Sequence, residues 1–295
     1  MITYTFRFRG FSLTATYLRL LIVGTCMSAA ITTSQAQTRA YVASNCTNSV
    51  FVVDTSTNAI VANISVGIGA SIPAVTPDGT RVFVSNSGSN TVSVIDTATN
   101  TVVSTIAVGL LPYGLAITPD GARVYVVNRL SGTISVIDTA TNTVVALIPD
   151  SLGPLQVGIT PDGTRAYVTN GDFIFSIFGT TVSVIDTATN TVIATIPLAP
   201  THNPTFVALT PDGTRLYVSN AANPITIGTL DVIDTATNTV LATIPTPDFC
   251  PLGIAIAPLI PRSKDDCKEG GYQRFRSLGF PNQGQCLKYV KEHTN

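Results

Sequence analysis

Aspartate is the residue of this chain that most often offers chemistry. Thirteen aspartates lie between Gln37 and Pro258, together with six arginines and neither lysine nor glutamate. Paired carboxylates could act as general acid and base or hold a metal ion. Nine of them, however, recur inside two short phrases, TPDG and DTATN (DTSTN in its first copy), where the side chain hydrogen-bonds to nearby backbone. We expect these nine to shape turns rather than to catalyse a reaction. They are Asp54, Asp78, Asp96, Asp120, Asp138, Asp162, Asp186, Asp212 and Asp234.

Histidine offers fewer possibilities, since the chain contains only His202 and His293. A zinc site built from both would also need a correctly placed carboxylate, and no spacing in the sequence suggests one. We find no glycine-rich phosphate loop, no GxSxG motif and no assignable Ser-His-Asp set. We therefore expect no catalytic residue, no metal site and no cofactor. The excess of aspartate over arginine argues against binding to a nucleic-acid backbone.

The two turn phrases alternate along the chain as parts of one repeat. SVIDTATNTV and its close variants occur five times, and their aspartates are 42, 42, 48 and 48 residues apart. A period in the forties is typical of propellers and solenoids. Within residues 114–148 the phrases separate four runs rich in Val, Ile, Tyr and Thr, which indicate four antiparallel strands, A to D, or one propeller blade. The sequence thus predicts an all-β domain over residues 37–260, a five-bladed β-propeller of four-stranded antiparallel blades.

The two ends of the repeat region complement each other. Residues 39–42 match strand B with no strand A before them, whereas residues 252–258 match strand A with no strand B after them. We expect both ends to share one closing blade, which would leave no exposed sheet edge. When the A–B hairpins are aligned, Cys46 and Cys250 face each other, so we expect a disulfide between them. Two free, buried thiols are the alternative.

The strand-B sequences carry a family resemblance. Residues 167–170 read YVTN, and the variants FVSN, YVVN and YVSN stand at 83–86, 125–128 and 217–220. Joined to TPDG and SVIDTATNTV, the stretch from about residue 39 to 258 resembles the YVTN-repeat β-propellers. The resemblance implies a secreted, periplasmic or cell-surface protein and a binding module without an assigned reaction. Many such propellers have seven blades, so pocket geometry does not carry over to a five-bladed chain.

The N-terminus has the pattern of an export signal. Arg7, Arg9 and Arg19 precede an apolar run, and small residues near Ala36 offer a cleavage site. We expect a cleaved signal peptide over residues 1–36, with lipidation at Cys26 as the weaker alternative. The apolar run is too short to span a bilayer, so we do not expect an integral membrane protein.

The C-terminus changes character, because lysine and glutamate reappear beyond Pro258. Residues 261–295 are similar to a short cysteine-paired tail appended to varied secreted bacterial proteins. The similarity implies a disulfide between Cys267 and Cys286. Attachment to the envelope or a partner and capping of the propeller are both open as roles for this tail.

Departures from the repeat indicate where a ligand could bind. The B–C loops and D–A connections share one face of a propeller, and both insertions, within 167–186 and 217–234, fall on it. Three phenylalanines in the first insertion could form an apolar patch, although strands B and C could instead simply extend past the blade. Three weaker candidates lie near the channel mouth. The candidate ligand-binding residues are Phe173, Phe175 and Phe178, followed by Gln156, His202 and Phe206.

We therefore expect a secreted, non-catalytic β-propeller that binds a protein, a peptide or a cell-envelope polymer through this loop face. The alternative is a propeller hydrolase, lactonase-like, with its site at the channel mouth. A structural cell-surface component that assembles through the tail is a third possibility. Convergent polar side chains around the axis would favour the hydrolase, and the sequence offers little there beyond Gln156 and His202.

Overall fold

A computed structural model of the protein describes residues 38–150, 153–172, 177–221 and 228–246, and further 254, 256, 267–268 and 283–293. These residues contain nineteen β-strands and one α-helix. The strands are, in chain order, β1 (Arg39–Ser44), β2 (Ser49–Asp54), β3 (Ala59–Ser65), β4 (Ala70–Val75), β5 (Arg81–Asn86), β6 (Thr91–Asp96), β7 (Thr101–Ala107), β8 (Pro112–Ile117), β9 (Arg123–Asn128), β10 (Thr133–Asp138), β11 (Thr143–Pro149), β12 (Pro154–Ile159), β13 (Arg165–Asp172), β14 (Ile177–Asp186), β15 (Thr191–Pro197), β16 (Asn203–Leu209), β17 (Arg215–Ala221), β18 (Thr229–Asp234) and β19 (Thr239–Pro245).

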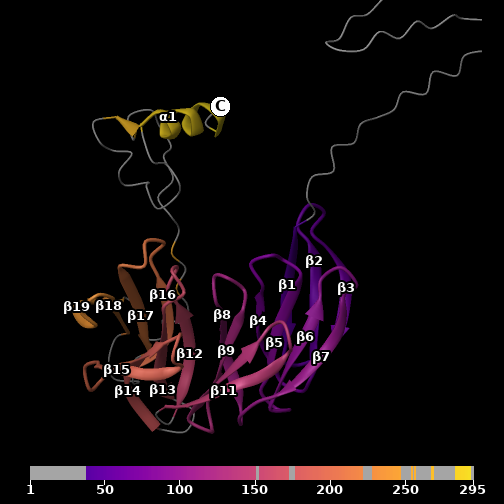
Figure 1. The fold of residues 1–295 in the computed structure, drawn as a ribbon, viewed down its shortest axis with the longest axis horizontal. Helices are drawn as coiled ribbons and strands as arrows, with labels where there is room; N and C mark the ends of the chain where they lie inside the picture. The colour runs from indigo at the N-terminus through magenta and orange to yellow at the C-terminus, as the bar shows by residue number, and fades with distance from the viewer. Residues whose placement is uncertain are drawn as a thin grey trace, which may run out of the picture. The chain divides into compact units, whose positions relative to one another are not determined.

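The strands form five antiparallel sheets, which we number I to V in chain order (Figure 1). Sheet I contains β1–β3, and sheets II, III, IV and V contain β4–β7, β8–β11, β12–β15 and β16–β19. Within every sheet the strands pair with their neighbours in the chain. The predicted all-β fold with four antiparallel strands per repeat is therefore confirmed for sheets II to V.

Both turn phrases close hairpins in the predicted way. In sheet II the hydroxyl of Thr76 donates to Oδ1 of Asp78 at 2.6 Å, and Gly79 takes a positive φ of 71°. In the second phrase the backbone nitrogen of Thr99 donates to Oδ1 of Asp96 at 2.8 Å. Both turns lie at one end of each sheet, which we call the turn end. The opposite end, with the connections between sheets, is the loop end.

Neighbouring sheets pack against one another in chain order. The first strands contact each other in sequence, β1 with β4, β4 with β8, β8 with β12 and β12 with β16. Between sheets III and IV the core combines Tyr125, Val127 and Ile148 with Ala166 and Val168. Because alternate residues of a strand face opposite sides, each central sheet contributes apolar side chains to two such cores.

The described residues do not close the expected ring. Sheet I has only three strands, and Ile254 and Ile256, which the sequence places in its missing strand A, lie in no strand. In sheets II to V a TPDG turn holds the first strand to the second, whereas no such turn follows residue 256. Cys46 is a free, exposed cysteine, so the expected Cys46–Cys250 disulfide is absent from the structure; Cys250 itself lies outside the described residues.

The tail contains the disulfide that its resemblance implied. Cys267 and Cys286 are bonded with their Cα atoms 5.7 Å apart, and both are buried beside Val290. Cys286 belongs to α1 (Gln283–His293). The expected signal peptide, residues 1–36, lies outside the described part of the chain. Among the residues that the structure describes, no helix is both long and apolar enough to cross a membrane.

Candidate functional site

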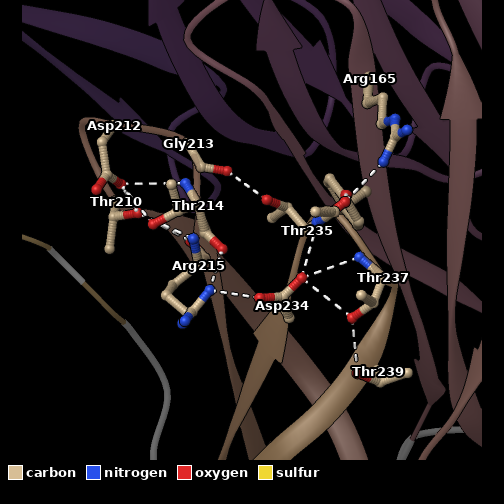
Figure 2. Close-up of polar contacts among 12 residues, drawn as sticks. Arg165, Thr210, Asp212, Gly213, Thr214, Arg215, Asp234, Thr235, Thr237 and Thr239 are labelled. Carbon is tan, nitrogen blue, oxygen red and sulfur yellow. Dashed lines mark hydrogen bonds and ion pairs between the residues drawn. The ribbon is translucent and has the colours of Figure 1, made fainter.

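Hollows open between neighbouring sheets at the turn end. The larger, about 490 Å³, lies between sheets IV and V and is lined by Asp162, Asp212, several threonines and Arg165. Arg165 crosses between the sheets, and its Nη1 donates to the carbonyl of Thr235 at 2.6 Å (Figure 2). A hollow of about 270 Å³ between sheets II and III is lined by the same residue types at the matching positions. Because the hollow recurs with the repeat, the repeat itself accounts for it.

The turn carboxylates are held as hydrogen-bond acceptors. Oδ1 of Asp234 accepts bonds from the backbone nitrogen and hydroxyl of Thr237, at 2.9 and 3.0 Å, and Oδ2 accepts one from Arg215 (Figure 2). The bonds from Thr237 lower the pKa of Asp234, and the charge of Arg215 lowers it further. The hydroxyl of Thr210 likewise lowers the pKa of Asp212. These groups therefore stay ionised at neutral pH and are poor proton donors there.

Polar contacts at the turn end also join each sheet to the next. An arginine or tyrosine of β1, β5, β9 or β13 reaches the Thr or Asn of the DTATN turn in the following sheet. We call these contacts the inter-sheet clasps. They are Arg39 with Thr97, Arg81 with Thr139, Tyr125 with Asn190 and Arg165 with Thr235.

At the loop end, sheets II to IV share a buried polar motif. In sheet II, Nδ2 of Asn86 donates to Thr91 Oγ1 and Ser93 Oγ at 3.1 and 2.9 Å. Asn128 and Asn170 make the same pair of bonds in sheets III and IV. Such a motif satisfies both amide hydrogens within the sheet, whereas Oδ1 of Asn86, Asn128 and Asn170 is buried and accepts no hydrogen bond among the described residues.

Sheet V replaces the serine of this motif with Asp231. Its Oδ2 accepts a bond from Asn220 Nδ2 at 2.9 Å and lies 2.8 Å from His202 Nδ1. Its Oδ1 accepts a bond from Thr243 Oγ1 at 2.5 Å. Asp231 is 1% exposed and His202 is 8% exposed. We call His202, Asn220, Asp231 and Thr243 the loop-end cluster.

The contact with Asp231 determines what His202 can do chemically. Because a carboxylate accepts, Nδ1 must carry the proton, which leaves the lone pair of the neutral ring on Nε2. No hydrogen bond to Nε2 occurs among the described residues. An imidazole oriented in this way can exchange a proton or bind a ligand. Within the described part of the chain, no group of three or more His, Cys, Asp or Glu side chains could hold a metal ion.

Sheet IV departs from the repeat at the same end. Ser183 Oγ, the serine of its motif, donates at 2.6 Å to Oδ1 of Asp150, which lies in the connection entering the sheet. Strands β13 and β14 continue beyond the motif through a bulge and one further pair. Gly171 in this extension approaches sheet V so closely that a Cβ there would lie 2.3 Å from the carbonyl oxygen of Pro204. The irregular parts of sheets IV and V therefore meet at the loop end.

The extension bears on one of the two interpretations of the insertion. Strands β13 and β14 do extend past the blade and pair with each other, as the alternative interpretation held. Phe173 and Phe175 lie outside the described residues. Phe178 belongs to β14, but its side chain lies outside them too. The aromatic patch therefore stays a prediction.

Gln156 and Phe206 occupy equivalent places on the first strands of sheets IV and V. Each follows a bulge, is half-buried, and pairs with the hydroxyl-bearing residue of the second strand, Thr169 or Ser219. Oε1 of Gln156 accepts a bond from the backbone nitrogen of Val157 at 3.0 Å. Among the described residues, no hydrogen bond joins Gln156 or Phe206 to the loop-end cluster.

Sequence reasoning named His202 but missed its partner. Neither Asp231 nor Asn220 was among the candidate ligand-binding residues. A signal was present, because DVIDTATNTV has an aspartate where the second, third and fourth copies have serine. A charged residue at a position that alternation places inside a sheet core needs a buried partner.

Comparisons with known proteins agree on the fold. Residues 69–177 match the model of the YNCE-like beta-propeller family. A structure of Kuenenia stuttgartiensis hydrazine synthase is similar over 72% of this chain and 65% of its own, with 29% identity and a TM-score of 0.65. Dihydro-heme d1 dehydrogenase NirN in complex with DHE is similar over 70% of this chain and 45% of its own, with 18% identity and a TM-score of 0.57.

This chain thus spans less than two thirds of either solved chain. The comparison with curated proteins found no match. Three findings indicate the same fold: antiparallel sheets that contact one another in chain order, the match to a propeller family model, and the similarity to these solved structures. The chain is a protein of the β-propeller type.

Proposed function

We propose that the protein is an exported, non-catalytic binding module that recognises a protein, a peptide or a cell-envelope polymer at the loop end of sheets IV and V. One observation carries this proposal: the departures from the repeat gather there. In sheet V Asp231 replaces a serine and contacts His202, and in sheet IV Asp150 and the β13–β14 extension depart from the repeat. The repeat itself does not require these departures, and irregular segments at the end of a rigid scaffold are common places for a ligand to bind.

The chemistry of the carboxylates supports binding over catalysis. The turn carboxylates have lowered pKa values because their own turns donate hydrogen bonds to them. A general acid needs a pKa near the working pH instead. Carboxylates of this kind serve as fixed acceptors for the backbone or a ligand.

Export is supported by both ends of the chain. The basic and apolar pattern of residues 1–36 fits a signal peptide, and the Cys267–Cys286 disulfide fits an oxidising compartment. A fusion of alkaline phosphatase to the C-terminus tests this proposal, since the phosphatase is active only when exported. Activity that survives deletion of residues 1–36 would contradict it.

The envelope fraction of the producing organism provides the direct test of binding. Tagged protein should retain an envelope component, and replacing Phe173, Phe175 and Phe178 by alanine, or Asp231 by serine, should lower its recovery at least tenfold. Ser93→Ala is the matched control, because it alters the same motif in sheet II. Equal recovery with all variants would overturn the proposal.

A hydrolase remains the second candidate because of one contact, the carboxylate-oriented imidazole of His202. A His–Asp pair of this kind can activate water or a hydroxyl. If the protein hydrolyses lactones, His202→Gln should abolish turnover of a γ-lactone substrate. Absence of turnover by the wild-type protein would remove this candidate.

A structural surface role is tested separately through the tail. Deleting residues 262–295 should leave envelope association intact if the loop end binds the partner. Loss of association in this deletion would instead favour assembly through the tail.

A further inference from the structure

Among the described residues, no sheet covers the face of sheet V that points away from sheet IV, whereas the corresponding faces of sheets I to IV are covered by the next sheet. In sheets I to IV, Ile64, Ile106, Ile148 and Ile196 occupy one position of the last strand and are 2–6% exposed. Ile244 occupies that position in sheet V and is 45% exposed. The neighbouring Tyr217 and Leu230 are half-buried, whereas their counterparts in sheet IV, Tyr167 and Val182, are fully buried. This open face has the composition of a sheet-to-sheet core.

Sheet I shows the complementary defect on its opposite face. Val42 is 49% exposed, whereas Val84, Val126, Val168 and Val218 at the same position of sheets II to V are fully buried. Ala40, two residues earlier, is also exposed. In the other sheets these positions pack against the preceding sheet, as Val82 and Val84 pack against Val50 and Val52. Sheet I therefore exposes the kind of face that, in sheets II to V, packs against the preceding sheet. The exposed face of sheet V has no such cover among the described residues.

The same two sheets also carry groups of an inter-sheet clasp that is not formed among the described residues. Asn100 of sheet II accepts a contact from Arg39 at 3.4 Å, and Asn190 of sheet IV accepts one from Tyr125. The equivalent acceptor of sheet I is Asn58, which shares their positive φ. No clasp to Asn58 occurs among the described residues. On sheet V the equivalent arginine, Arg215, bonds to Asp234 of its own sheet, as Arg123 of sheet III bonds to Asp138.

We propose that sheet V of one copy of the chain packs against sheet I of a second copy, in the geometry that already joins sheets I to V within one copy. Within a copy, β1 packs on β4 and β16 on β12, and both end faces stay exposed. Exposed apolar faces of this kind mark an interaction surface. A second copy supplies the matching face with the same side chains and clasp. Such a contact is heterologous, so it builds a ring or a longer assembly.

Cross-linking at the clasp tests this proposal directly. In a background with Cys46 and Cys250 replaced by serine, one chain carries Arg215→Cys and another Asn58→Cys. The two are mixed and treated with a short bis-maleimide. A single chain with Arg39→Cys and Asn100→Cys is the matched positive control, because those residues form the clasp between sheets I and II.

The mixture should give a species of two chains that contains both variants. Ile244→Asp should reduce its yield at least tenfold, whereas Leu241→Asp should not, because Leu241 is as exposed as its counterparts Val103, Val145 and Ile193. Circular dichroism confirms that both variants are folded. Cross-linking confined to a single chain in the Arg215→Cys/Asn58→Cys double variant would overturn the proposal in favour of intrachain closure. Failure of the mixture while the control pair cross-links would overturn it outright.

Discussion

Nδ1 of His202 lies 2.8 Å from Oδ2 of Asp231, 29 residues further along the chain, and both side chains are buried. The contact stands at the point where sheets II to IV carry an uncharged serine. The two residues are therefore expected to depend on each other energetically. A double-mutant cycle measures that dependence.

His202→Ala should lower the free energy of unfolding by about 2–3 kcal/mol, because Oδ2 of Asp231 then keeps only the bond from Asn220. Asp231→Ser should cost less, about 1 kcal/mol, because it restores the serine of sheets II to IV and leaves only Nδ1 without an acceptor. The double variant should be more stable than the sum of the two changes implies. Urea unfolding followed by circular dichroism gives all three values. Strict additivity would contradict the pairing.

Ser135→Asp provides the control for this cycle. It places an aspartate at the matching position of sheet III, where no histidine lies nearby in the described motif. It should destabilise the protein more than Asp231→Ser does. A neutral effect would show that the site tolerates a carboxylate without a partner.

Alkaline pH should loosen the contact between sheets III and IV. Burial raises the pKa of Tyr125 to about 12, because the phenolate is disfavoured in the core. The neutral phenol therefore contributes to the free energy of unfolding. This contribution is fully present below the unfolded-state pKa, about 10, and is lost as the pH rises toward 12.

Thermal unfolding between pH 8 and 11.5 measures this effect. Tyr125→Phe should lower stability at pH 8 by about 1 kcal/mol, since Tyr125 loses its bond to Asn190. The variant should also lose less stability than wild type between pH 10 and 11.5. Identical alkaline slopes for the two proteins would contradict this assignment.

Reducing the tail disulfide should affect the tail selectively. The Cys267–Cys286 bond closes a segment with a sequence separation of 19, and such a link is worth about 3 kcal/mol. Cys286→Ser should raise hydrogen exchange in α1 while leaving the strands protected. Cys46→Ser, which removes a free and exposed thiol, is the control and should change neither. Loss of protection in the strands as well would show that the tail supports the sheets.

The sequence predicted what local chemistry decides. TPDG and DTATN specify their turns within four or five residues, so hairpins and sheets follow from the repeat. The described residues do not form the closing blade, which required residues 252–258 to pair with β1 across most of the chain without a turn to hold them. The same reasoning applies to Cys46, whose expected partner depended on that pairing.

The loop-end cluster could be predicted only in part. Asp231 stands where sheets II to IV have serine, which distinguishes sheet V from them. Its contact with His202, however, depends on the path of the connection between β15 and β16, which alternation and turn residues do not specify. The loop face could thus be predicted from the sequence, but the contact between His202 and Asp231 could not.

The proposed binding site rests on His202, and nuclear magnetic resonance of the histidine rings tests it most directly. The chain has two histidines, so a ¹⁵N-histidine-labelled sample gives two sets of ring signals, assigned with a His293→Gln variant. Titration with soluble fragments of the producing organism's cell envelope should shift the His202 signals to saturation and leave those of His293 in place. In Asp231→Ser the same titration should not shift the His202 signals. Binding of the same fragments without any change at His202 would contradict the account.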